Sequence, residues 1–331
     1  GRVDERLHKV VNAYGLGETV PSDGGFLIEK QFSAELLQAA FERANIASLC
    51  RRIPIGGNSN GVKIPGLDES SRATGSRWGG CRGYWVAEAD EKTKSKPKFR
   101  QIELELKKAA VLVYTSDELL QDSTILGDVI GRIARDELAF MLDDAIINGT
   151  GAGMPLGILN SGALVTQAAE SQAAGSLVPE NISKMWARLF ATSQKTSVWL
   201  INQELLPMLY LLKIEGDAGA VTTLYMPPGG FSQAPYGTIF GRPVIPIEQC
   251  QAPDTAGDII LADFANGYVL AEKGGVKSDL SIHVRFVYDE SVFRFVMRVD
   301  GQPVLSQPIA PYKGSNDLSH FVTLAGSRTA E

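Results

Sequence analysis

The sequence has 331 residues, of which 44% are hydrophobic and 21% are charged, and this ordinary globular composition excludes a disordered or fibrous chain. The 38 acidic residues outnumber the 32 basic ones, and a net charge of −6 argues against a general nucleic-acid binder, which carries a basic surplus. At about 150 residues per domain, the length predicts two domains.

Cysteine spacing and hydropathy narrow the class further. Cys50, Cys81 and Cys250 form no CxxC pair, so the sequence predicts reduced thiols, no metal site and no cofactor. The apolar stretches fall far short of the roughly 18 residues of a membrane span, which predicts no membrane partner. The first residues also lack the apolar core of a signal peptide.

The N-terminal part of the chain divides into an arm and a helix. The first 25 residues mix charge, Gly and Pro without a sustained period, which predicts an extended arm. Between Phe26 and Cys50, apolar residues recur at three- and four-residue steps and predict an amphipathic helix.

Residues 54–113 contain two strand-like arms around a polar middle rich in Gly and Ser. In the return arm, Ile102, Leu104 and Leu106 alternate with charged residues. Continued backwards, this period of two predicts a basic ribbon on one face of an extended segment, formed by Lys92, Lys94, Lys96, Lys98 and Arg100. Because a hairpin with so few apolar residues is marginal in water, we expect its order to depend on a partner surface.

The acidic residues near this ribbon bear on what it contacts. They are Glu88, Asp90, Glu91, Glu103 and Glu105. This mixed charge favours contact with an acidic neighbouring subunit over contact with nucleic acid, although the second alternative stays open.

The strongest helix pattern covers residues 123–148, a length of roughly 39 Å at 1.5 Å per residue. Thr115 and Glu118 predict a capped turn before it. Near its end, Asp143 and Asp144 are adjacent and so point to different faces. We therefore expect a solvated face and not a catalytic carboxylate pair.

Residues 150–272 alternate between helical and strand patterns, which predicts an α+β domain. Helices are expected at 182–190 and 203–212, and strands at 197–201, 244–247 and 258–262. Residues 280–299 predict two long antiparallel strands around Asp289-Glu290, and FVTL near the end predicts a last strand.

The glycines and histidines supply no enzyme motif. Gly149, Gly151, Gly153 and Gly157 follow a helix, whereas a dinucleotide-binding loop follows a strand and opens a helix. They predict a structural turn. His8, His283 and His320 pair with no nucleophile in a recognisable motif, so we expect no catalytic residues and no enzyme.

Four short motifs, taken in order along nearly the whole chain, resemble the major capsid proteins of tailed phages with the Hong Kong 97-type fold. They are Gly24-Gly25 with Phe26-Leu27-Ile28, Asn148-Gly149-Thr150-Gly151, Pro155-Leu156-Gly157-Ile158 and Gly241-Arg242-Pro243-Val244. Each motif is weak alone, and their order and spacing carry the resemblance.

The resemblance implies an α+β Hong Kong 97-type fold divided into four parts. Residues 1–25 would be the N-terminal arm and residues 54–108 an extended E-loop, which we call the 54–108 loop. The peripheral domain would comprise 26–53, 109–149 and 273–303, and the axial domain 150–272 and 304–331.

The resemblance also implies a function. Such a major capsid protein self-assembles as pentamers and hexamers into an icosahedral shell around the double-stranded DNA of a tailed phage, in the host bacterial cytoplasm. Its location is the virion, and its partners include a portal, a decoration protein and a maturation protease. Gly1 in place of methionine fits either maturation cleavage or a residue left by cloning. The five basic residues of the ribbon are expected to make inter-subunit contacts.

One member of this family locks its shell with isopeptide bonds between a lysine and an asparagine of a neighbouring subunit, with a glutamate as base. Lys96-Pro97 matches the lysine position, whereas the asparagine position falls near Arg294. The glutamate position falls near Asp300 or Gly301. Without the amide electrophile we expect no crosslinking, and we expect Lys96 to make an ionic contact.

Three alternatives remain open from the sequence. An encapsulin-type nanocompartment shell shares the fold and encloses protein cargo, and a gene transfer agent capsid has the same sequence pattern. Outside the class, an α/β enzyme would predict a small oligomer with a defined pocket.

Overall fold

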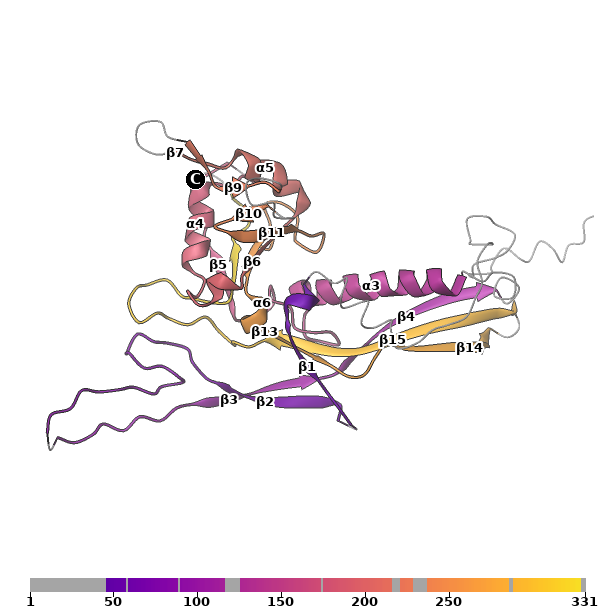
Figure 1. Ribbon diagram of the computed structural model, residues 1–331, viewed down its shortest axis with the longest axis horizontal. Helices are drawn as coiled ribbons and strands as arrows, with labels where there is room; N and C mark the ends of the chain where they lie inside the picture. Colours follow the sequence, from indigo (N-terminus) through magenta and orange to yellow (C-terminus); the bar gives the residue numbers. More distant parts are fainter. Residues whose placement is uncertain are drawn as a thin grey trace, which may run out of the picture. The chain divides into compact units, whose positions relative to one another are not determined.

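The computed structural model describes residues 46–57, 59–88, 90–116, 126–173, 175–215, 221–228, 237–285 and 288–328 (Figure 1). The predicted arm, and the predicted helix as far as residue 45, lie outside this part of the chain. The chain separates into two compact units. One comprises Gly1–Ser48, Leu106–Asp143 and Glu272–Val299, and the other comprises Leu49–Glu105, Asp144–Ala271 and Asp300–Glu331.

The first unit contains a ladder of three antiparallel strands. Strand β15 (Glu290–Pro303) lies between β4 (Lys107–Ser116) and β14 (Lys277–Arg285). The pair β14 and β15 confirms the two long strands expected within residues 280–299. Thr115 belongs to β4, opposite Ser291, whereas Glu118 and the turn that the two residues were expected to cap lie outside the described residues.

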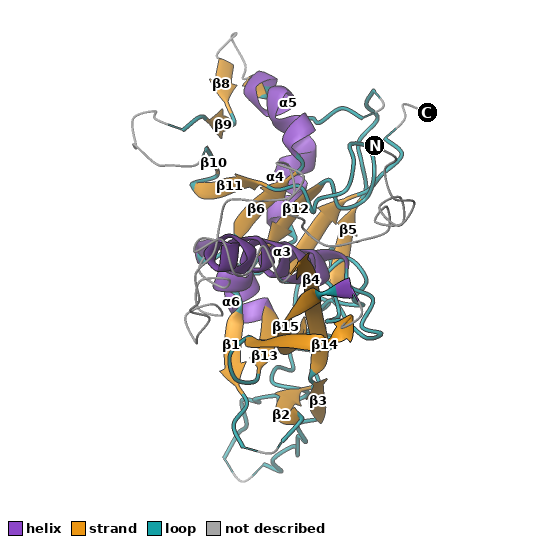
Figure 2. Cartoon of the chain, turned by 90° about the vertical axis from the view of Figure 1, so that its right-hand side faces the viewer, coloured by secondary structure: helices purple, strands orange, loops and turns teal. Residues whose placement is uncertain are grey.

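Helix α3 (Leu126–Asn148) confirms the long helix expected over residues 123–148 from Leu126 onward. Its buried side chains recur every four residues, at Ile130, Ala134, Leu138 and Leu142. This stripe is the apolar face expected of an amphipathic helix. Figures 1 and 2 both show the first part of α3 lying along the strands of its unit.

The second unit is built around a seven-stranded mixed sheet, which contains both parallel and antiparallel strand pairs. The strands, in spatial order, are β5 (Leu164–Gln167), β16 (Phe321–Leu324), β12 (Ile259–Ala262), β6 (Val198–Ile201), β11 (Arg242–Pro246), β10 (Thr238–Ile239) and β9 (Tyr225–Met226). Every residue of β6, β12 and β16 is buried, as expected for central strands.

The smaller elements of this unit complete its core. They are the 3-10 helices η4 (Ser193–Lys195) and η5 (Gln203–Leu205), helices α4 (Pro179–Ala187), α5 (Leu206–Leu211) and α6 (Phe264–Gly267), the strand pair β7 (Lys213–Glu215) and β8 (Val221–Thr223), and the paired strands β1 (Arg51–Pro54) and β13 (Tyr268–Glu272). The fully buried Trp199 lies at the centre of the core cluster. The helices and strands expected within residues 182–262, and the last strand, are confirmed with ends shifted by a few residues. Figure 2 shows the mixed α+β character, in which helices are few and strands prominent.

The 54–108 loop begins and ends as an antiparallel pair. Strand β2 (Gly61–Leu67) pairs with β3 (Phe99–Glu105) from Gly61 opposite Glu105 to Leu67 opposite Phe99. Ile102 and Leu104 are buried on one face, and on the other Glu103 pairs with Lys63 at 2.9 Å. The alternation expected for the return arm is thus confirmed over β3.

Candidate functional site

The outer part of the 54–108 loop combines exposed aromatic rings with positive charge. Trp85 is fully exposed, and Trp78, Tyr84 and Phe99 are also exposed. Between residues 77 and 98 the sequence carries six basic and three acidic side chains, a local net charge of +3 in a chain of −6. Large exposed apolar groups together with one sign of charge are typical of a surface that another protein covers.

The five predicted contact residues differ in their placement. Lys92, Lys94, Lys96 and Lys98 are exposed on irregular backbone, because β3 begins at Phe99 and the ladder does not extend through them. Arg100 is half-buried on the face of Ile102 and Leu104, and its Nη2 donates to the Val304 carbonyl. Burial lowers the pKa of Arg100, and the negative charge of Asp68 opposes part of this shift. The role of all five in contacts between subunits stays a prediction.

The inner part of the loop, which we call the loop root (residues 66–78), is fastened to a later segment of the same unit. Ser71 forms a parallel bridge with Ala310. Within this bridge, the Arg72 amide donates to the Ala310 carbonyl at 2.8 Å, and the Ala310 amide donates to the Ser70 carbonyl at 3.1 Å. These hydrogen bonds fix the direction in which the 54–108 loop continues beyond strand β2.

Strand β3 is fastened to the same later segment. The Glu105 amide donates to Asp300 Oδ2 at 2.9 Å, and Gln302 Nε2 donates to the Glu103 carbonyl at 3.0 Å. The expectation that the hairpin has no surface of its own is therefore wrong at its base. The segment that supplies the surface lies about 200 residues further along the chain, beyond the reach of a local pattern.

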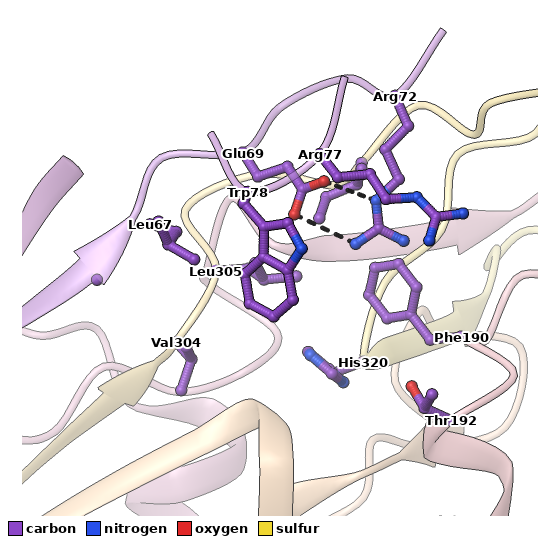
Figure 3. A pocket seen from close by; sticks show the side chains of 12 residues that line it. Leu67, Glu69, Arg72, Arg77, Trp78, Phe190, Thr192, Val304, Leu305 and His320 are labelled. Carbon is purple, nitrogen blue, oxygen red and sulfur yellow. Dashed lines mark hydrogen bonds and ion pairs between the residues drawn. The ribbon is translucent and has the colours of Figure 1, made fainter. Parts of the chain in front are cut away.

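The loop root covers a cavity of about 530 Å³ in which apolar groups surround three basic side chains (Figure 3). Its wall comprises Gly66, Leu67, Glu69, Arg72, Arg77, Trp78, Phe190, Thr192, Val304, Leu305, Ile309 and His320. Arg72 Nε donates to Glu69 Oε1 at 2.7 Å. The same guanidinium lies over the Phe190 ring, 5.5 Å from its centroid, in a cation–π contact.

His320 lies on the other side of Phe190, with ring centroids 4.9 Å apart (Figure 3). Its Nδ1 is 2.8 Å from Ser193 Oγ and 3.8 Å from Asp263 Oδ2. Burial lowers the pKa of His320; Asp263 opposes this shift, and Arg72 adds to it. Sequence reasoning missed the surroundings of this histidine, because its partners Arg72, Phe190, Ser193 and Asp263 come from three separate segments and form no motif.

A tight backbone hairpin presents Trp78 beside the cavity. Arg77 and Cys81 exchange two backbone hydrogen bonds of 2.7 Å. Trp78 has a φ of 55°, which is unusual for a bulky residue, and the next residue, Gly79, has a φ of 75°. A Cβ on Gly79 would lie 2.5 Å from the Lys98 carbonyl oxygen, so this approach of the two arms requires glycine.

The glycine-rich segment after α3 is a structural turn, as the sequence predicts. The Gly157 amide donates to the Gly149 carbonyl at 2.8 Å, and the Ile158 amide donates to the Ile146 carbonyl at 2.9 Å. Asn160 Nδ2 donates to the Asn148 carbonyl at 2.7 Å. The backbone thus folds back onto the last turn of the helix and satisfies carbonyls that a helix end leaves open.

Asp143 departs from its predicted solvated role. Its carboxylate is buried and accepts from the Ala47 amide at 3.0 Å, at the start of the 3-10 helix η3 (Ala47–Leu49). Asp144 accepts from Asn148 Nδ2 at 2.7 Å. The prediction of a solvated face is therefore wrong for Asp143, because an acceptor was needed for an amide 96 residues away.

Helix α3 also has an exposed face that is both apolar and acidic. Ile133, Phe140 and Met141 are exposed by 58%, 46% and 40%, and Asp136 and Glu137 are exposed beside them. Residues spaced by three, four and seven positions share one side of a helix. This face therefore offers apolar contact area beside two acidic side chains, with the exposed Arg132 four residues before Asp136.

Within the described ranges, no three His, Cys, Asp or Glu side chains are grouped as a metal ion requires. No described helix is long and apolar enough to cross a membrane.

Comparison with known proteins gives one family and one fold. A profile of the phage capsid family matches residues 24–314. Among solved structures, a capsid chain of a native GTA particle computed with C5 symmetry has a TM-score of 0.64 at 18% identity, covering 94% of this chain and 99% of that one. A chain from Microbacterium phage Oxtober96 has a TM-score of 0.58 at 15% identity, covering 90% and 93%.

The holo-SrpI encapsulin complex of Synechococcus elongatus PCC 7942 is also similar, with a TM-score of 0.54 at 10% identity, covering 98% of this chain and 95% of that one. At these identities the likeness shows a shared fold. No curated protein matches the sequence.

Proposed function

This chain belongs to the phage capsid family and is a major capsid shell protein, and from that premise we propose that it assembles as pentamers and hexamers into an icosahedral shell around double-stranded DNA. The observation that carries the proposal is the family match over residues 24–314, which includes the 54–108 loop and both units. In this proposal the shell forms in the host bacterial cytoplasm and becomes the virion capsid. A portal, a decoration protein and a maturation protease would be its partners.

We assign the four parts of the chain accordingly. Residues 1–25 act as the arm, 54–108 as the E-loop, 26–53 with 109–149 and 273–303 as the peripheral domain, and 150–272 with 304–331 as the axial domain. The exposed aromatic and basic side chains of the loop support a role in contacts between subunits, because such a surface is stable in water only when it is covered.

The exposed face of α3 has the chemistry that complements this loop. Its apolar groups match Trp85 and Tyr84, and Asp136 and Glu137 match the four loop lysines in charge. We therefore assign the α3 face of a neighbouring copy as the surface that the loop covers. Repetition of this contact around the shell gives high avidity from weak individual contacts.

Electron microscopy of the purified protein tests the shell. We expect closed, uniform particles of 35.6 kDa subunits that contain DNA protected from nuclease. Particles filled with a protein cargo would instead support the encapsulin alternative. A discrete small oligomer under assembly conditions would overturn the proposal.

Charge reversal tests the loop contact. Replacing Lys92, Lys94, Lys96 and Lys98 with Glu should reduce the yield of particles, since it places like charges opposite Asp136 and Glu137. Adding D136K and E137K to the same chain should restore assembly. As a matched control, Lys195→Glu and Lys313→Glu change exposed lysines outside the loop. Unchanged assembly of the fourfold variant would contradict the contact.

A further inference from the structure

We propose that His320 is a pH-sensitive latch, which holds the root of the 54–108 loop in place while its ring is neutral and releases the root when the ring is protonated. The proposal concerns one chain and its own contacts, and it holds whether or not the shell assembles as proposed above.

The geometry connects His320 to the loop through one aromatic ring. Phe190 lies between the imidazole, whose ring centroid is 4.9 Å away and whose plane is tilted by 59°, and the Arg72 guanidinium, 5.5 Å from the ring centroid. Arg72 is itself part of the backbone bridge with Ala310 that fastens the loop root. The state of the His320 ring therefore acts on the residue at which the loop is attached.

The neutral ring suits this position. One ring nitrogen is already 2.8 Å from Ser193 Oγ, and the ring packs against Phe190 at the wall of the mostly apolar cavity. A neutral imidazole needs one donor and one acceptor partner at most, and it stacks on an aromatic ring without a cost in charge hydration.

Protonation changes the balance at the same place. The imidazolium has two N–H donors and a full charge that must be hydrated, and a mostly buried ring beside a largely apolar wall is hydrated less well than a ring in water. The positive charges of the imidazolium and of Arg72, on either side of Phe190, also repel each other. Lifting the loop root from the cavity gives the ring water and separates the two cations.

The charged groups that line the cavity, and Asp263 behind the imidazole, enter this balance. From the loop root come Glu69, which pairs with Arg72, and Arg77; from the turn before α6 comes Asp263. Asp263 favours the imidazolium, but its carboxylate already accepts hydrogen bonds from the Thr196 hydroxyl at 2.9 Å and from Asn266 Nδ2 at 2.9 Å. Burial and Arg72 oppose Asp263, and the net direction is a lowered pKa with the root docked.

The sign of the pH dependence follows from that direction. A histidine with a lowered pKa in the docked state binds its proton more readily after the root has left, where its pKa returns toward about 6.5. Docking is therefore fully favoured above that value and weakens as the pH falls below it. Each unit by which docking lowers the pKa changes the docked population about tenfold at low pH.

Hydrogen–deuterium exchange on the purified protein, in whatever state of assembly it adopts, tests the latch. After correction for the intrinsic rate, peptides that contain the amides of Arg72 and Ala310 should exchange faster at about pH 5 than at about pH 7.5. Peptides from β6 should show no such change, since this strand is central and buried. Equal protection of the root peptides at both pH values would overturn the proposal.

Two variants assign the effect to one histidine. H320Q keeps a polar group near Ser193 and cannot be protonated, so its root peptides should lose the pH response. H283Q changes an exposed histidine on β14 and should keep it. A persistent response in H320Q would overturn the latch.

A measurement on the unmodified protein covers the case in which H320Q fails to fold. The exchange rate of the imidazole C2 proton, followed by mass spectrometry, reports the pKa of each histidine in its own peptide. We expect His320 to titrate below about 6.5. Titration at or above that value would contradict the latch.

Discussion

Gly157 is a residue that the fold fixes by lack of space. A Cβ at this position would lie 2.4 Å from the Gly149 amide nitrogen and 2.5 Å from the Ile147 carbonyl oxygen. Both neighbours are backbone atoms of the turn that closes on the end of α3, and neither can move without breaking the hydrogen bonds of that turn.

We therefore predict that Gly157→Ala destabilises the protein by about 1–3 kcal/mol, because it overpacks a backbone contact. Differential scanning calorimetry of wild-type and variant particles measures the effect as a lowered Tm. Gly56→Ala is the matched control, since no atom lies within 4 Å of the added Cβ, and it should change stability by less than about 0.5 kcal/mol. Equal Tm values for the two variants would contradict this account.

A second residue-scale prediction concerns a buried ion pair. Arg328 Nη2 is 2.5 Å from both carboxylate oxygens of Asp258, and both side chains have no exposed surface. Removing one partner leaves a buried charge without compensation, so Arg328→Met should cost about 3–5 kcal/mol. The double variant with Asp258→Asn should recover part of that loss in a double-mutant cycle of unfolding free energies. Additive losses would show that the two charges are not coupled.

At the scale of elements, periodic segments could be predicted and their ends could not. Helix α3 and the β14–β15 pair each carry a long apolar repeat that only one kind of element satisfies. The basic ribbon shows where this reasoning fails. The alternation of β3 predicts an extended strand on the N-terminal side of Phe99, but a strand continues only while a partner strand is present, and β2 ends opposite Phe99 at Leu67.

The same limit explains why the sequence does not predict that Asp143 caps η3. A carboxylate on a helix is predicted to face solvent unless its hydrogen-bond donor is known. Here the donor, the Ala47 amide, is 96 residues away in the sequence. We predict that Asp143→Ala costs about 1–2 kcal/mol and speeds amide exchange in the peptide that contains Ala47. Asp143→Asn keeps one acceptor oxygen and should lose less. An unchanged exchange rate at Ala47 in Asp143→Ala would contradict this role.

At the scale of the whole molecule, the order of short motifs was sufficient to predict the fold and the family. Only part of the candidate site could be predicted from the sequence. The lysines of the loop were visible as a local pattern, whereas the Phe190 stack joins residues that are far apart along the chain and individually unremarkable in type. Contacts of this kind depend on the tertiary fold and leave no periodic signal.

The residue at the position of the crosslinking relative's asparagine decides whether the subunits of a particle can be joined covalently. Arg294 lies close to that aligned position, and its Nη2 pairs with Asp279 Oδ2 at 2.6 Å. A guanidinium cannot serve as the electrophile for a lysine amine, so no isopeptide bond should form. Boiled and reduced particles should run as a single band near 35.6 kDa on a denaturing gel. A ladder of multimers would contradict this prediction.

The bonds that fasten the 54–108 loop also order events during synthesis. Arg100 and Glu105 reach acceptors 204 and 195 residues later in the chain. At about 5–20 residues per second, the ribosome needs roughly 10–40 s to supply those acceptors after the loop has emerged. During that interval the hydrogen bonds that join the loop to residues 300–310 cannot form. A nascent subunit therefore completes the attachment of its loop only when most of the chain has been translated, and we expect unfinished chains to be poor partners for a growing shell.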